Sequence, residues 1–148
     1  MDESILMTKD EIHDFGIEVV FKYLKKDGYE IISVNTDLKY NPQIIASKDG
    51  TKAFIAVRTD CYPNKGVLEE STHFEMIKHA DKNGATPYFA SVGICNSSGE
   101  NEEEMSKPVK GAGFYVSFMG LLIITRSDRV KVFGKDGSIK NLSDEHDE

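Results

Sequence analysis

The sequence has little cysteine and no long hydrophobic run, and each absence excludes a class of protein. Among its 148 residues only Cys61 and Cys95 are cysteines, too few for a disulfide scaffold or a cysteine zinc site. The longest apolar-rich stretch, residues 114–125, has 12 residues, whereas a membrane-spanning helix needs roughly 20. The first residues, MDES, show no basic or apolar region of a secretory signal. We therefore expect a cytoplasmic protein that does not enter a membrane.

The sequence also lacks an excess of positive charge, because 18 basic residues face 25 acidic ones and the net charge is −7. The excess lies in two places, a polar acidic loop at 97–111 with four glutamates and an acidic tail at 143–148 with four acids. Without these eight acids, 17 acids remain against 18 bases. The body is therefore nearly neutral, which argues only weakly against nucleic acid as a partner.

Local patterns predict two helices, five strands and a C-terminal hairpin. Thr8 and Glu11 have the spacing of a capping box at the start of the first helix, and Asp49-Gly50 is a hairpin signal between two strands. Gly120 indicates a corner that would make residues 113–125 either one bent strand or two short strands. The expected helices are 8–27 and 67–83, and the expected strands are 29–35, 43–47, 52–59, 87–96 and 113–125, followed by a hairpin in 129–142.

This order, α-β-β-β-α-β-β-β, indicates one α/β domain over residues 1–148, with a mixed sheet flanked by helices. Two stretches within residues 16–59, GIEVVFKYLKKDGYEIISVN and NPQIIASKDGTKAFIAVRT, carry a more specific pattern. With the order of elements, they resemble the PD-(D/E)xK, or restriction-endonuclease-like, nuclease superfamily. The closest likeness is to its small bacterial members that are similar to Holliday-junction resolvases. The resemblance covers about a third of the chain and implies the fold of that superfamily.

The resemblance also implies where a metal site would lie. In the family, an acid on the first helix, an Asp on the second strand and a Glu on the third strand hold Mg²⁺, and a Lys two residues after that Glu assists the attacking water. In this sequence these positions fall on Glu18, Gln43, Ala56 and Arg58, respectively. Two of the three carboxylates are missing, and arginine does not act as a base near neutral pH. We therefore expect a degenerate site with no catalytic residue, no bound metal and no cofactor.

The residues at these positions allow more than one interpretation. Glu18 is either a relic ligand or a solvated residue of an amphipathic helix. Gln43 and Arg58 could face each other and form a polar pocket for a phosphate or a partner's carboxylate. Alternatively, Arg58 forms an ion pair with Glu18 that simply satisfies two buried charges. The histidines show no metal-ligand spacing, and Glu69 with His73 is expected to be a surface i,i+4 pair.

The sequence thus favours a non-catalytic, nuclease-fold binding module whose partner is a protein or DNA, with the acidic patches favouring a protein. A homodimer formed through the C-terminal strands is one such complex. The alternative is a Mg²⁺-dependent DNA endonuclease or resolvase whose ligands have moved to acids near strand ends, such as Asp37, Asp49 or Asp60. A third reading is an α/β domain unrelated to nucleases, in which the four site positions would not cluster.

Overall fold

The computed structural model describes residues 5–125, 131–133 and 139–141, and these residues form three helices and eight strands. The elements in chain order are α1 (Lys9–Lys26), β1 (Glu30–Val34), β2 (Ile44–Lys48), β3 (Thr51–Cys61), α2 (Glu70–Asn83), β4 (Ala85–Asn96), α3 (Glu102–Met105), β5 (Phe114–Phe118), β6 (Leu122–Ile123), β7 (Lys131–Phe133) and β8 (Ile139–Asn141).

Six of these strands form one mixed sheet with the order β1-β2-β3-β4-β5, and β6 also pairs with β4. β1, β2 and β3 form an antiparallel meander, α2 crosses over to the parallel strand β4, and β5 and β6 return antiparallel to it. β7 and β8 pair with each other in a separate two-stranded ladder. The predicted α/β class, a mixed sheet flanked by helices, is therefore confirmed.

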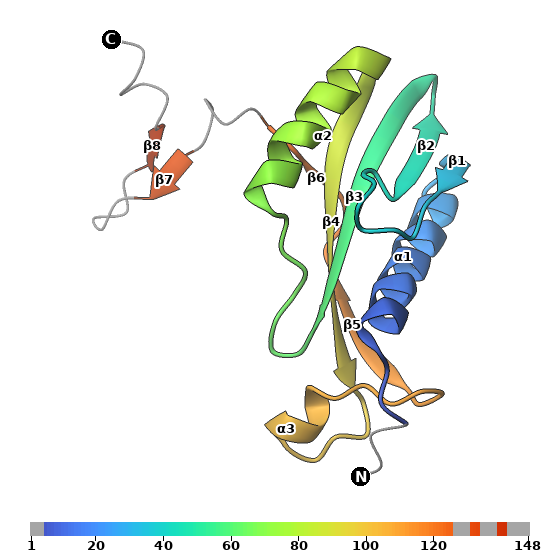
Figure 1. Ribbon diagram of the computed structural model, residues 1–148, viewed down its shortest axis with the longest axis vertical. Coiled ribbons are helices and arrows are strands. Elements are labelled where there is room, and N and C mark those ends of the chain that lie inside the picture. Colours follow the sequence, from blue (N-terminus) through green and yellow to red (C-terminus); the bar gives the residue numbers. More distant parts are fainter. Residues whose placement is uncertain (1–4, 126–130, 134–138, 142–148) are drawn as a thin grey trace.

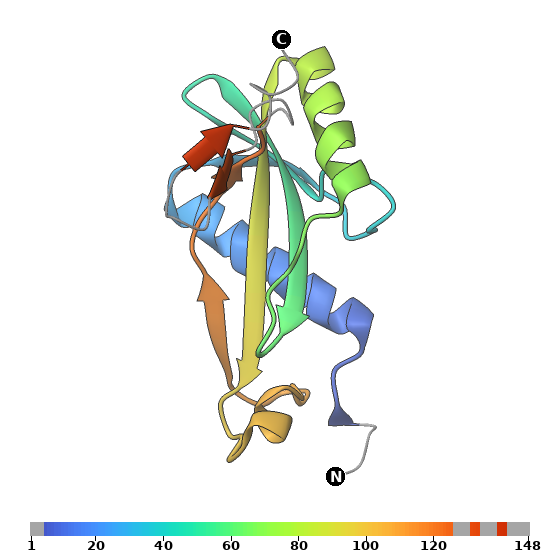
Figure 2. The same ribbon diagram turned by 90° about the vertical axis from the view of Figure 1, so that its left-hand side faces the viewer.

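The two long helices cover opposite faces of the sheet (Figure 1, Figure 2). β3 lies at the centre, and its residues from Ala53 to Arg58 are all buried. Because alternate residues of a strand face opposite sides, Ile55 and Val57 pack in the core cluster beneath α1, whereas Phe54 and Ala56 pack in the cluster beneath α2. The near-continuous apolar run of this strand is explained by its cover on both faces.

Helix α1 begins as the sequence predicts. The Thr8 side chain accepts a hydrogen bond from the Glu11 backbone N–H, and the Glu11 carboxylate accepts one from the Thr8 N–H, which completes the capping box. Lys25 and Lys26 occupy the last turn, where positive charge is favourable. The first helix expected at 8–27 is therefore confirmed to within one residue at each end.

Helix α2 begins later than the sequence predicts, at Glu70 rather than at residue 67. The preceding segment is held against β4, because the Gly66 N–H donates to the Val92 carbonyl at 3.1 Å and the Ser91 hydroxyl donates to the Gly66 carbonyl at 2.6 Å. A Cβ on Gly66 would overlap the Arg58 carbonyl, so the chain lies flat on β3 at this point. These tertiary contacts outweigh the helical pattern of the first three residues.

The local sequence pattern was sufficient to predict the secondary structure of residues 113–125, but not that of the acidic loop. Residues 113–125 form two short strands, β5 and β6, and Gly120 between them has φ +95°. The acidic loop at 97–111 contains the short helix α3, which the sequence analysis missed. The Asn101 side chain caps this helix by accepting from the Glu104 N–H at 2.9 Å. The acidic tail at 143–148 and the turn of the 129–142 hairpin lie outside the described residues.

Within the described part of the chain, no helix is both long enough and apolar enough to cross a membrane.

Gly16 lets α1 pack directly against Thr59 of β3, and alanine at this position is expected to lower the free energy of unfolding by about 2 kcal/mol. A Cβ on Gly16 would overlap the Thr59 hydroxyl and lie 2.8 Å from the Thr59 Cβ. This overlap outweighs the gain of up to about 1 kcal/mol that alanine brings to a helix. Urea unfolding of Gly16→Ala measures the loss. Glu18→Ala is the matched control on the same helix, and we expect it to change stability by less than about 0.5 kcal/mol. If Gly16→Ala were as stable as the wild type, α1 would not pack against Thr59 as closely as described.

Candidate functional site

The candidate site lies where β2 ends and β3, still paired with β4, continues without a partner strand on its other side. The β2–β3 ladder stops at the pair Ile44–Ile55, whereas β3 extends to Cys61. The Gln43 side chain fills the gap, because its Oε1 accepts a hydrogen bond from the Val57 N–H at 2.8 Å. Gln43 is 1% exposed. Its amide therefore continues the hydrogen bonding of the sheet one step beyond the strand.

Arg58 is buried next to this amide and is bound on every nitrogen of its guanidinium. Nη1 donates to the Gln43 Oε1 at 3.1 Å and to the Val57 carbonyl at 2.9 Å. Nη2 donates to the Asn41 Oδ1 at 3.0 Å, and Nε lies 3.1 and 3.0 Å from the two carboxylate oxygens of Glu69. Arg58 is 6% exposed. The four side chains of Asn41, Gln43, Arg58 and Glu69 are called the Arg58 cluster below.

The cluster satisfies a buried positive charge with the protein's own acceptors. A buried guanidinium without partners would be strongly unfavourable, and charge-assisted hydrogen bonds are the strong kind. The Gln43 Nε2 donates in turn to the Tyr40 carbonyl at 3.2 Å and to the Asn41 Oδ1 at 3.0 Å. The donors that could hold a phosphate or a foreign carboxylate are therefore largely engaged within the chain.

Of the four positions singled out by the sequence, the structure joins Gln43 and Arg58 by a hydrogen bond, and the other two take no part in that contact. Glu18 lies on α1 with a side chain that is 56% exposed, and it pairs with Lys22 at 2.9 Å, one turn along the helix. Ala56 is fully buried in the core under α2. The prediction of an ion pair between Glu18 and Arg58 is therefore wrong, because Arg58 pairs with Glu69 instead.

Glu69 is the member of the cluster that sequence reasoning missed as a partner of Arg58. It occupies the N-cap position of α2, and its side chain remains 55% exposed. Burial alone would raise the pKa of its carboxyl, but its own backbone N–H and the Arg58 charge outweigh burial, so the pKa is lowered. The prediction that the Glu69 and His73 side chains pair is wrong, since the His73 Nε2 lies 2.7 Å from the Thr125 carbonyl oxygen instead. The signal in the sequence is a single arginine within an apolar strand, because a buried guanidinium requires an acidic or polar partner.

His13 is the residue of α1 that is influenced by Arg58. It is 7% exposed, and among the described residues its Nε2 has no hydrogen-bond partner. Burial lowers the pKa of His13, and the positive charge of Arg58 lowers it further. The sequence analysis chose Glu18 on this helix, but the geometry puts His13 within the electrostatic reach of the cluster. The imidazole is therefore neutral at pH 7.

His13 is expected to make the fold less stable as the pH falls from about 6.5 toward 5. Because its pKa is lower in the folded protein than in the unfolded chain, the unfolded chain binds more protons in this range. The free energy of unfolding then falls with decreasing pH, by at most about 1.4 kcal/mol per pH unit from this one group. Urea midpoints between pH 7.5 and 5 measure the effect, and His13→Gln should flatten it. His79→Gln, at an exposed position on α2, is the control. If the stability of His13→Gln depended on pH as strongly as that of the wild type, His13 would not be the group responsible for the loss.

The acids considered as relocated metal ligands lie in or next to turns or, for Asp60, at the end of β3, and two of them bind backbone N–H groups. The Asp37 Oδ1 accepts from the Lys39 N–H at 2.9 Å, and the Asp60 Oδ1 accepts from the Cys61 N–H at 2.7 Å. Asp49 has φ 53° in the β2–β3 turn. Across residues 5–125, 131–133 and 139–141, no group of three or more histidine, cysteine, aspartate or glutamate side chains could hold a metal ion.

The fold and the cluster define a small α/β domain with a mixed sheet and a closed polar cluster at the N-terminal end of α2. The chain belongs to a family described as a domain of unknown function, DUF8840, whose model matches residues 10–124. The match spans both long helices and the six-stranded sheet. Among the curated proteins, none matches the sequence.

Proposed function

We propose that this protein is a non-catalytic binding module for other protein chains, built on a nuclease-like scaffold without the nuclease metal site. The observation that carries the proposal is the closed Arg58 cluster. Gln43 and Arg58 stand where the resemblance puts an aspartate and a lysine, and their polar groups bind each other, Asn41 and Glu69. A site that generates a metal-bound hydroxide needs free carboxylate oxygens at this point.

The packing of Ala56 supports the same proposal. This residue stands where the resemblance puts the metal-binding glutamate, and it is fully buried among Phe54, Met76 and Ala80. A carboxylate there would have to leave water for an apolar environment, which is unfavourable. At this position, core packing beneath α2 stands in place of the carboxylate that the resemblance implies.

A protein partner is favoured over nucleic acid by the character of the surface. The chain carries a net charge of −7, and Glu102, Glu103 and Glu104 project from α3 with exposed or half-buried side chains. Phosphate backbones are bound by clustered Lys and Arg, and their strong field would be opposed by these acids. In contrast, exposed large apolar side chains gather between residues 115 and 123, a composition typical of protein interfaces.

Incubation with labelled duplex and branched DNA in Mn²⁺, over a series of salt concentrations, tests the proposal. We expect no cleavage and no saturable binding at about 0.15 M salt, where nucleic-acid binders still hold DNA. DNA binding whose affinity falls steeply with salt would show a nucleic-acid-binding protein and would overturn the choice of a protein partner. Cleavage of either DNA would overturn the proposal entirely and favour the endonuclease alternative.

A further inference from the structure

β5 presents an unpaired edge to one side of the sheet. On β4, Val92 and Ile94 direct their carbonyl groups to the loop that follows β3. Backbone groups of successive strand residues point to opposite sides, so the residue between them, Gly93, faces β5, where it is paired with Ser117. The residues of β5 that alternate with Ser117 therefore direct their N–H and C=O groups outward. No strand of the described part of the chain lies beyond them; they are Phe114, Val116 and Phe118.

This edge lacks the features that normally prevent strands from pairing between molecules. Residues 113–125 contain no charged residue and no proline, although 29% of the whole chain is charged. Tyr115, Val116 and Met119 are 67%, 43% and 86% exposed. The opposite edge of the sheet, β1, carries Glu30 and a bulge, both of which hinder pairing. Of the two edges of the six-stranded sheet in the described residues, β5 is therefore the one open to pairing.

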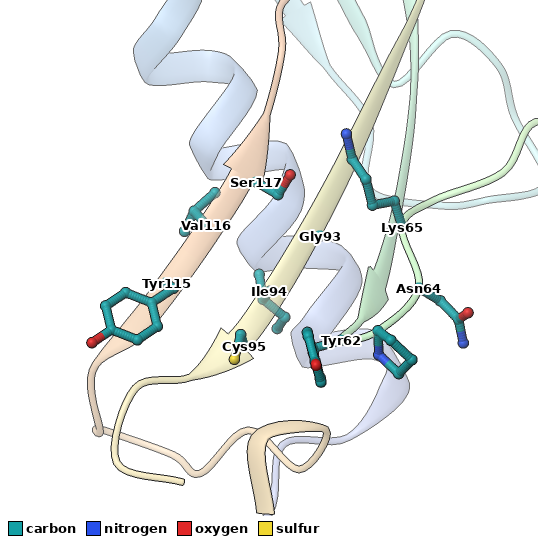
Figure 3. Close-up of a pocket in the computed structure, with 10 residues that line it drawn as sticks. Tyr62, Asn64, Lys65, Gly93, Ile94, Cys95, Tyr115, Val116 and Ser117 are labelled. Carbon is teal, nitrogen blue, oxygen red and sulfur yellow. The ribbon is translucent and has the colours of Figure 1, made fainter. Parts of the chain in front are cut away.

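The surface beside β5 is complementary to β5 itself. Tyr115 and Ser117 point to the same face of the sheet, and next to them lies a cavity of about 350 Å³ whose floor includes Gly93 and Cys95 (Figure 3). If two β5 strands pair antiparallel with Val116 at the two-fold axis, Tyr115 of one copy lies opposite Ser117 of the other. Each large ring then packs over the small Ser117 side chain of the other copy, beside the Lys65 side chain, whose Cγ would lie 3.0 Å from a Cβ on Gly93. The contact occurs twice in the symmetric pair.

We propose that β5 is a homodimer interface, in which two copies pair their β5 strands antiparallel and continue the sheet across both. The inference rests on the proposed function for the class of partner and names that partner as a second copy. With roughly 200 Å² for a fully exposed large side chain, the exposed parts of Tyr115, Val116 and Met119 contribute about 400 Å² per copy. With the strand backbone, the total is typical of a weak interface. An uncharged edge is also where two copies of net charge −7 repel each other least.

Analytical ultracentrifugation of the full chain over a wide concentration range tests the proposal. We expect the mass to rise from 16.5 kDa toward twice that value at about micromolar to hundred-micromolar concentration. Added salt should strengthen the dimer, because it screens the repulsion between like-charged copies. Val116→Lys and Met119→Lys should each weaken association by tenfold or more. Ile32→Lys, at a 54% exposed position on β1, is the matched control and should leave association unchanged.

The outcomes separate this proposal from the proposed function. A wild-type chain that stays monomeric throughout overturns the dimer, while the DNA assay independently decides the class of partner. A dimer that tolerates both lysine variants, or that Ile32→Lys disrupts equally, would use another surface and would also overturn the proposal. Circular dichroism of each variant identifies one that fails to fold. Met119 is 86% exposed, so its substitution tests the edge without disturbing the core.

Discussion

Replacing Ala56 with glutamate is expected to lower the free energy of unfolding by about 4 kcal/mol or more, which would unfold a large fraction of the protein. The side chain has no exposed surface and packs in the cluster with Phe54, Met76 and Ala80. Glutamate would add volume to this cluster and would bury a carboxylate, while Arg58, two residues along the strand, is already bound to Gln43 and Glu69. Urea unfolding measures the loss, and a melting curve by circular dichroism shows whether any folded protein remains.

Two controls separate the charge from the volume. Ala56→Met adds comparable volume without charge and should cost about 1–3 kcal/mol. Lys52→Glu adds a carboxylate at an exposed position of the same strand and should have an effect within about 0.5 kcal/mol. If Ala56→Glu were as stable as the wild type, position 56 would be open to water. The claim that core packing occupies the place of the metal ligand would then be wrong.

Replacing Gln43 with leucine is expected to lower the free energy of unfolding by roughly 3 kcal/mol. Leucine removes the acceptor for the Val57 N–H and for the Arg58 Nη1, and both donors are buried. A buried donor that loses its partner costs about 1–3 kcal/mol. Chemical unfolding at pH 7 measures the change. The matched control is Asn83→Leu, which removes an amide that donates to the His79 carbonyl at an exposed position and should change stability little.

The double variant Gln43→Leu with Arg58→Met tests whether the two residues act as a unit. Removal of Arg58 also removes the guanidinium that Gln43→Leu leaves short of an acceptor. The loss in the double variant should therefore be smaller than the sum of the two single losses, by about 1 kcal/mol or more. Simple additivity would contradict the cluster as described, because residues that share no partner give additive effects.

The fold could be predicted largely from local signals. The capping box at Thr8, the Asp49-Gly50 turn and the apolar run of β3 each depend on neighbouring residues, and the structure contains all three features. The start of α2 could not be predicted in this way. It depends on contacts of Gly66 with β3 and β4, which lie outside the helix.

Fewer contacts of the candidate site could be predicted from the sequence. The contact between Gln43 and Arg58 was one of two alternatives, because the resemblance puts both positions at one site. The partners Asn41 and Glu69 were not anticipated, since they come from a loop and from a helix start whose positions are set by tertiary packing. The choice of Glu18 over His13 on α1 followed from the resemblance rather than from the helix face. The buried face of α1 includes His13 and leaves Glu18 in solvent.

Titration of the full chain with Mn²⁺ can be followed through the electron paramagnetic resonance signal of the free ion. It tests whether a closed polar cluster and a packed core occupy the positions where the resemblance puts a nuclease metal site. We expect the free-ion signal to rise as it does in buffer, with no saturable binding below about 1 mM. Saturable binding at tenfold lower concentration that is lost in Glu18→Ala would contradict this expectation, and would show that carboxylates of this chain still assemble a metal centre.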